Sequence, residues 1–368
     1  MAATNLVPLT SIRFFAALRV AMYHCVDWDS SGYWWRGLMA TPASVSYFFV
    51  SSGFLLTYSY AQRFDHDELR YGTFWLGRCL RLLPVYYLGL LVALPLSLRA
   101  HELSAGKALL TVLVLQSWSP HTALYWNYPA WALSNLAFCY FTLPFLLRIT
   151  RGRSRMWWLM SAAVAWIISL ALSFTYFHWN PDGLTQINTS SEGFWLYVLK
   201  FNPLVHVPEF FIGMIAGRIF TASGPISNRE ANFSFILAAC AILYILLLGY
   251  RIPYPVTHTG LLAPLLAIVV ISIASGGFAA SILRARWLVI LGQSSFALYM
   301  LHAPLMQYVV WKWSDNKSPS HAAKLATVAA IVAISLAMYK WVEAPVTAAL
   351  RGRFFKPLPS VPKIIPAS

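Results

Sequence analysis

The stretch RFFAALRVAMYH at residues 13–24 places three polar side chains inside an apolar run. This run belongs to an apolar segment over 8–27, and about 20 mostly apolar residues let a helix cross roughly 30 Å of hydrocarbon. A charged group in such a span costs at least about 2.5 kcal/mol and usually lines an interior or aqueous cavity. The stretch therefore predicts a membrane helix with a polar face turned into a helical bundle.

The spacing of the polar residues predicts which of them share that face. Arg13 and His24 are eleven positions apart, which at about 100° and 1.5 Å per residue brings them within roughly 20° of each other and about 16 Å apart along the axis. Arg19 lies about 140° from His24, and no role is predicted for it. An imidazole facing a cavity can act as a general base at neutral pH. The alternative is that His24 only forms a hydrogen bond to a neighbouring helix.

The rest of the chain has the same apolar character. Of its 368 residues, 59% are hydrophobic and 11% are charged, whereas a soluble domain carries about 25% charged residues. Further apolar segments that are long enough to span occur at 42–62, 82–98, 129–147, 156–177, 204–220, 232–250, 260–279, 287–311 and 324–343. We expect an all-α fold, a polytopic transmembrane helical bundle of about ten spans that forms one domain over 1–350.

Two segments stand outside this pattern. The apolar piece KALLTVLVLQSW at 107–118 is short for a span, so it predicts a re-entrant or interfacial helix. Residues 351–368 follow the last span and predict a basic cytoplasmic tail.

The net charge of +15 is explained by topology rather than by nucleic-acid binding. Its Lys and Arg residues form short clusters between apolar segments instead of a stripe along one helix. These clusters fall mainly on the side that holds both termini, which predicts a multi-pass protein of the cell (inner or plasma) membrane with both termini cytoplasmic. The four cysteines lie in or beside apolar segments and form no CxxC pair, so neither a disulfide framework nor a metal site is predicted.

A pair of arginines marks the start of the predicted third span. In RCLRLLP, Arg78 and Arg81 are three residues apart and lie on adjacent helical turns at the cytoplasmic mouth. Two guanidinium groups so placed can clamp phosphates. The alternative is the ordinary enrichment of arginine in cytoplasmic loops.

Two further motifs combine small and polar residues. In YFFVSSGFLL, Ser52 and Gly53 either let two helices approach closely or present a hydroxyl to a cavity. In PEFFIGMIAG, Glu209 either binds a polar substrate or interacts with the helix dipole. Close packing is the simpler explanation of the first motif, and the dipole is the simpler explanation of the second.

The last two predicted spans carry polar side chains as well. His302 lies in LGQSSFALYMLHAP, and Glu343 lies in WVEAP near the inner end of the final span. A carboxylate at that depth is expected to pair with an inward-facing arginine such as Arg13 or Arg78.

Taken in order, these motifs resemble acyltransferase family 3, a family of integral membrane enzymes that O-acylate cell-surface glycans and some small molecules. The resemblance covers about residues 6 to 345 and rests on seven collinear motifs: LTSIRFFAALRVAMYH, YFFVSSGFLL, RCLRLLP, PAWALSNLAFCYFTLP, PEFFIGMIAG, LGQSSFALYMLHAP and WVEAP. It implies that His24 is the catalytic histidine and Arg13 its partner. It also implies that Arg78 and Arg81 bind the acyl-CoA donor.

The resemblance extends to supporting positions and has two departures. Ser52 and Gly53 match a family SGF element, and Glu343 matches the glutamate before a C-terminal proline. However, Leu136 replaces a glutamate in the tryptophan-led motif, and Thr10 replaces an aspartate found in many members. The charge around Arg13 is therefore expected to differ from that of the family.

By this resemblance, the protein transfers an acyl group, with acetyl expected, from cytoplasmic acyl-CoA to a hydroxyl of a cell-surface glycan or another extracytoplasmic carbohydrate or small molecule. His24 then acts either as a base or as a transient acyl carrier, and the sequence leaves both routes open. One rival hypothesis is a transporter or exporter of a polar or lipid-linked molecule through an Arg- and His-lined cavity. Another is a purely structural role for the polar residues as contacts between helices.

Overall fold

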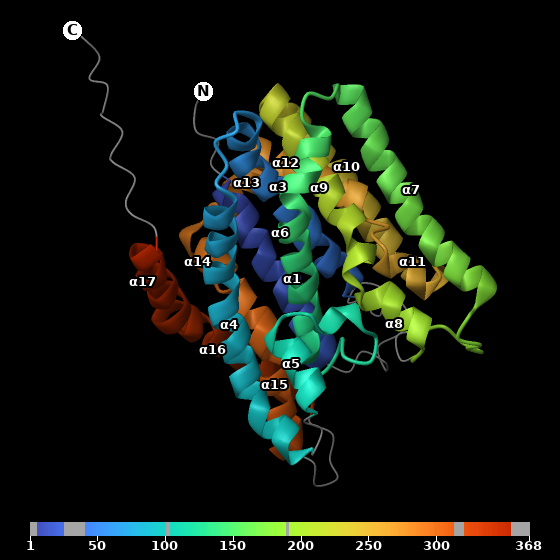
Figure 1. Ribbon diagram of the computed structural model, residues 1–368, viewed down its shortest axis with the longest axis vertical. Coiled ribbons are helices and arrows are strands. Elements are labelled where there is room, and N and C mark those ends of the chain that lie inside the picture. The colour runs from blue at the N-terminus through green and yellow to red at the C-terminus, as the bar shows by residue number, and fades with distance from the viewer. Residues whose placement is uncertain (1–5, 26–40, 101–103, 189–190, 313–319, 355–368) are drawn as a thin grey trace.

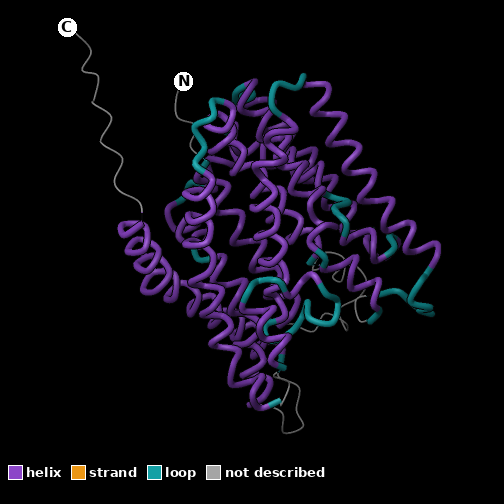
Figure 2. Tube along the Cα trace, viewed as in Figure 1, coloured by secondary structure: helices purple, strands orange, loops and turns teal. Residues whose placement is uncertain are grey.

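The computed structural model describes residues 6–25, 41–100, 104–188, 191–312 and 320–354 (Figure 1). Within these ranges the regular structure is helical throughout and contains no strand (Figure 2). The predicted all-α class is therefore confirmed for the part of the chain that is described.

Three helices that are far apart in the sequence form the centre of the bundle: α1 (Val7–Cys25), α3 (Pro42–Asp65) and α9 (Pro203–Ser223). Helix α3 packs along α9, and α1 packs against α3 and against two helices near the C-terminus, α14 (Arg286–Gln293) and α15 (Ser295–Lys312). The remaining longer helices surround these five: α4 (Tyr71–Arg99), α6 (Trp131–Thr150), α7 (Arg155–Trp179), α10 (Asn228–Leu247), α12 (Ala263–Ser275) and α16 (His321–Met338). Helices α3 and α9 are mostly buried, and α1 exposes only Val7 and Phe15, so their polar side chains need not face lipid.

In the described residues, seven helices are long and apolar enough to cross a membrane. They cover Tyr71–Arg99, Tyr128–Thr150, Arg155–Trp179, Phe194–Ser223, Asn228–Leu247, Tyr254–Ser275 and His321–Phe354. Helices α14 and α15, bent by 54° at their junction, make an eighth if they count as one span. The predicted spans at 8–27 and 42–62 are helical as α1 and α3 but do not meet this criterion, so the count of ten is not confirmed. Both helices carry many polar residues because they lie inside the bundle.

Short helices complete the fold. The helix predicted over 107–118 is present as α5 (Ala105–Val112) followed by the 3₁₀ turn Gln116–Trp118. Other short elements are η2 (Tyr128–Ala130), α8 (Phe194–Phe201), η3 (Gly249–Arg251), α11 (Tyr254–His258) and α13 (Gly277–Leu283). After α16 the chain passes through the π-helical segment Tyr339–Glu343 into α17 (Ala344–Phe354), which extends beyond the predicted domain boundary at residue 350.

Outer helices present apolar side chains to their surroundings. Helix α7, at the edge of the bundle in Figure 1, exposes Met156, Leu159, Met160, Val164, Ile167 and Ile168. Its few buried residues are polar, and two serines bond to carbonyls of the α11 region, Ser169 to Thr259 and Ser173 to Pro255. An exposed apolar face with a polar inner contact is the arrangement expected of a lipid-facing helix.

The crossing of α3 and α9 depends on glycine. A Cβ atom at Gly53 would lie 2.1 Å from the carbonyl oxygen of Phe210, and one at Gly213 would lie 2.0 Å from that of Val50. Real Cβ atoms do not approach backbone oxygens this closely. The two backbones therefore touch in a way that a larger residue at either position excludes.

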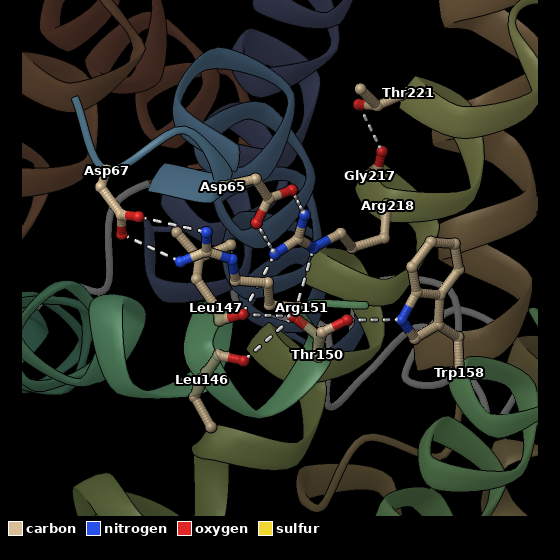
Figure 3. Close-up of polar contacts among 10 residues, drawn as sticks. All are labelled: Asp65, Asp67, Leu146, Leu147, Thr150, Arg151, Trp158, Gly217, Arg218 and Thr221. Carbon is tan, nitrogen blue, oxygen red and sulfur yellow. Dashed lines mark hydrogen bonds and ion pairs between the residues drawn. The ribbon is translucent and has the colours of Figure 1, made fainter. Parts of the chain in front are cut away.

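A partly buried ion pair ties together the ends of three helices (Figure 3). Arg218 on α9 forms a bidentate pair with Asp65 at the end of α3, with Nη2 to Oδ1 at 3.0 Å, and its Nε donates to Thr150 Oγ1 at 3.2 Å. Beside it, Arg151 and Asp67 form an exposed pair at 2.9 Å, and the hydrogen bonds and charge of Arg151 lower the pKa of Asp67. The Arg218–Asp65 pair fixes the ends of α3, α6 and α9 relative to one another.

Candidate active site

A cavity of about 800 Å³ lies between α1, α3, α4, α6, α15 and α17. Ligand pockets generally measure about 300–1,000 Å³, so this one has the size of a small-molecule site. We call it the arginine cavity because its lining contains Arg13, Arg78, Arg81 and Arg351. Arg351, which the sequence assigned to the tail, lies in α17 and completes the group of four.

The guanidinium groups retain unused hydrogen-bonding capacity. Arg78 donates from Nη2 to the Tyr60 hydroxyl at 3.1 Å, with its guanidinium carbon 5.6 Å from the centre of the Tyr60 ring. The Nε atoms of Arg13 and Arg78 are buried and have no hydrogen-bond partner among the described residues. Buried donors without a partner are costly, so a ligand that accepts hydrogen bonds would be stabilised in this cavity.

One carboxylate, that of Glu343, belongs to the described lining of the arginine cavity. The sequence predicted that it pairs with Arg13 or Arg78, but its charge interacts with Arg81 instead. Depth in the membrane gives the level of a side chain and not its neighbour, which explains the difference. No direct ion pair joins Glu343 to an arginine in the described structure, and its buried Oε2 atom has no hydrogen-bond partner there.

Other predicted residues take different places around the arginine cavity. Ser52 lines it, and so do Thr10 and Leu136, the two positions at which the chain departs from the family pattern. Gly53 does not line it and instead permits the contact of α3 with α9. With Thr10 and Leu136 uncharged, the cavity keeps the strong positive character that its arginines confer.

A second cavity of about 710 Å³ contains His24, and we call it the histidine cavity. Three rings surround the imidazole of His24: Tyr23 at 5.2 Å and Tyr128 at 5.0 Å between ring centroids, both edge-on, and His302 stacked at 5.4 Å. The lining of the histidine cavity also includes Lys200 and His258. The rings fix the orientation of the His24 side chain.

His302 supports His24 from outside the cavities. It is fully buried, and its Nδ1 lies 2.6 Å from the carbonyl oxygen of Tyr299. A carbonyl only accepts, so Nδ1 carries the proton of that hydrogen bond. The Nε2 atom is buried and has no partner among the described residues. His302 thus lines neither cavity and contacts the rings of His24 and Tyr128.

Val45 and Tyr299 line both cavities and so mark the place where the two meet. The sequence predicted that Arg13 and His24 share one inward stripe. Both do face the interior, but each opens to a different cavity because side chains of α3 and α15 lie between them. Arg19 lines neither of these two cavities, in keeping with its different angular position.

Glu209 lies away from both cavities and is almost fully buried. It pairs with His206, Nδ1 to Oε1 at 2.8 Å, and accepts a hydrogen bond from Ser46 Oγ. His206 Nε2 also lies 2.9 Å from the carbonyl oxygen of Lys200. These contacts join α3, α8 and α9. Glu209 therefore holds helices together and does not line either cavity.

Tyr128 and Lys200 are cavity residues that the sequence did not single out. Tyr128 lies next to the first proline of PAWALSNLAFCYFTLP, and its buried hydroxyl has no partner in the described structure. Its position beside that motif was the one sequence feature that could have indicated Tyr128 as a site residue. Lys200 lies in the loop-rich region before the sixth predicted span and carried no motif. Within the described residues, no group of three or more His, Cys, Asp or Glu side chains is placed to hold a metal ion.

Apolar helices around an arginine-lined and a histidine-lined cavity define a multi-pass membrane protein with an internal polar site. A family model described as "Acyltransferase domain" matches residues 9–340, so the chain belongs to this acyltransferase family and is an acyltransferase. Acyltransferase MdmB of Streptomyces mycarofaciens is 26% identical over 322 residues, which cover 83% of this chain and 80% of that protein. No solved structure gives a significant match.

Proposed function

We propose that this acyltransferase moves an acyl group, with acetyl the expected one, from acyl-CoA in the arginine cavity to an acceptor hydroxyl in the histidine cavity. The observation that supports this most directly is the meeting of the two cavities at Val45 and Tyr299. One cavity suits a polyanionic donor, the other contains the imidazole, and the boundary between them is formed by few side chains. A cell-surface glycan or another extracytoplasmic carbohydrate or small molecule is the proposed acceptor.

On the donor side, the four arginines bind the phosphates of CoA, and Arg13 is the one that belongs to the same helix as His24. Charge-assisted hydrogen bonds from guanidinium to phosphate are about twice as strong as neutral ones. Arg13 and Arg78 supply buried Nε donors that are otherwise unused. The acyl end of the donor then lies toward Val45 and Tyr299.

On the acceptor side, His24 takes the proton of the attacking hydroxyl or first carries the acyl group as an acyl-imidazole. In either route the thioester C–S bond breaks and an ester C–O bond forms. In the base route the imidazole takes the hydroxyl proton and gives it to the departing thiolate, which leaves as CoA. In the acyl-imidazole route a C–N bond to His24 forms as the C–S bond breaks and CoA leaves; the hydroxyl then breaks the C–N bond, and its proton goes to the released imidazole. Tyr128 supplies a hydroxyl that can donate to the oxyanion of the tetrahedral intermediate.

The two ends of the described chain support one orientation in the membrane. Leu6 and Val7 before and at the start of α1 and Arg351 near the end of α17 all line the arginine cavity, which supports placing both termini on one side. Together with the distribution of Lys and Arg along the sequence, this favours a cytoplasmic arginine cavity in the cell membrane. The donor then enters from the cytoplasm and the acceptor from outside.

The experiment that tests the function uses purified protein in liposomes with acetyl-CoA labelled in the acetyl group. Transfer predicts release of free CoA together with label in an acceptor fraction from the surface of the producing cells. Movement of a molecule across the bilayer without consumption of acetyl-CoA would contradict the proposal and favour a transporter.

A further inference from the structure

Lys200 is a buried cation in the histidine cavity that the proposed reaction does not use. It lies at the end of α8 with only 6% of its surface exposed. A lysine in a span normally extends its ammonium group toward the interface or pairs with an acidic side chain. In the described structure Lys200 has no acidic partner.

The surroundings of the ammonium group are aromatic. Its Nζ lies 5.6 Å from the ring centre of Tyr197, 5.3 Å from that of Phe201 and 5.1 Å from that of Tyr254. Three rings at this distance stabilise a cation through their π faces. They accept none of its hydrogen bonds in the way an oxygen does, so its donors remain available to a ligand.

No acidic side chain of the described structure lies within 4 Å of Lys200, and none belongs to the described lining of the histidine cavity. Glu192, which is exposed in the loop before α8, acts on the Lys200 charge only from a greater distance. Inside a membrane protein an isolated buried charge is costly, and a counter-ion from a ligand removes much of that cost.

We propose that Lys200 binds an anionic group, a carboxylate or a phosphate, carried by the acceptor whose hydroxyl is acylated. This inference rests on the proposed function, because it takes the histidine cavity as the acceptor site. The aromatic rings hold the ammonium group in one place, and His24 lines the same cavity. The enzyme therefore selects acceptors in which a hydroxyl and an acidic group belong to one molecule.

The test compares three matched probes: methyl β-D-glucoside, methyl β-D-glucuronide and methyl glucoside 6-phosphate. The first is neutral, the second carries a carboxylate and the third carries a phosphate. Comparing the last two shows which anionic group Lys200 binds. Binding is measured first, without donor, as the change in Tm of the purified protein. At least one anionic probe should raise the Tm of the wild type and of Lys200→Arg, whereas Lys200→Met should not respond.

Transfer is measured next with labelled acetyl-CoA. The wild type should show a kcat/KM for the bound anionic probe about ten- to a hundredfold above that for the neutral glucoside, the range expected for a hydrogen bond to a charged group. Lys200→Met should abolish this preference. Lys340→Met, which changes an exposed lysine outside both cavities, should retain it.

Equal Tm shifts with the neutral and anionic probes, no shift with either anionic probe, or an unchanged response in Lys200→Met would each overturn the role of Lys200. Binding of an anionic probe that depends on Lys200, without transfer to any acceptor, would instead support the anion site and contradict the proposed function. The two hypotheses therefore fail in different ways.

Discussion

The phenol ring of Tyr128 packs edge-on against the imidazole of His24, with 5.0 Å between the ring centroids and 64° between the ring planes. Its hydroxyl is buried and has no hydrogen-bond partner in the part of the chain that the structure describes. A polar atom kept without a partner beside a candidate base is costly for stability. Its position is explained if it donates a hydrogen bond during the reaction.

Tyr128→Phe removes that hydroxyl and keeps the ring. We expect kcat to fall about 10²-fold, the lower end of the effect of losing one oxyanion donor, with little change in donor affinity. Tyr254→Phe is the matched control, because Tyr254 lines the same cavity but its hydroxyl is already bonded to His258 at 2.8 Å. Equal kcat values for the two variants would show that the Tyr128 hydroxyl has no special role.

Val45 is expected to limit the size of the acyl group because it lies where the two cavities meet. Val45→Ala should raise kcat/KM for butyryl-CoA relative to acetyl-CoA, and Val45→Phe should block transfer while leaving donor binding intact. Val85→Ala is the control, since Val85 is buried but lines neither cavity. The measurement is a series of acyl-CoA donors of increasing chain length, and an unchanged preference in both Val45 variants would place the path elsewhere.

Arg78 is expected to bind donor phosphate. Arg78→Met should weaken acyl-CoA binding by about ten- to a hundredfold, as for loss of one charge-assisted hydrogen bond, and should make it less sensitive to salt. Arg63→Met changes an exposed arginine outside the cavity and should leave the affinity unchanged. The measurement is equilibrium binding of labelled acetyl-CoA at two salt concentrations. Equal affinities for Arg78→Met and Arg63→Met would contradict the role of Arg78.

Gly53 is expected to be required for folding rather than for chemistry. In Gly53→Ala the new methyl group would meet the Phe210 carbonyl oxygen at 2.1 Å, so α3 and α9 must separate and Tm should fall. Gly72→Ala adds a methyl group with no atom within 4 Å and should be neutral or slightly stabilising, because alanine favours helix by about 1 kcal/mol. A similar Tm for both alanine variants would mean that the helices can adjust.

The helices could be largely predicted from the sequence, because an apolar run of sufficient length has few alternatives to a helix in a membrane. Hydropathy was a weaker guide for α1 and α3 at the centre, whereas α9 meets the criterion for a span. Arg13, Arg19 and His24 lower the mean hydropathy of α1, although burial in the bundle is what permits them there. Hydropathy measures the fit of a helix to lipid, and the central helices contact mainly protein.

The candidate site could be predicted only in part. Helical periodicity indicated that Arg13 and His24 face inward, yet periodicity gives no information about the side chains of other helices that divide the space between them. The same limit applies to Glu343, for which Arg81 is the charged neighbour. Arg351 was missed because its helix continues through a π-helical segment that no sequence pattern marked.

His24 is the residue proposed to perform the acyl transfer between the two cavities. The most direct measurement is single-turnover transfer from labelled acetyl-CoA by His24→Ala, with donor binding and Tm measured on the same sample and His258→Gln as a control from the same cavity. We expect His24→Ala to bind donor normally and to lose about 10²- to 10⁴-fold in rate, while His258→Gln keeps most of its activity. Transfer at the wild-type rate by His24→Ala would contradict this role of His24.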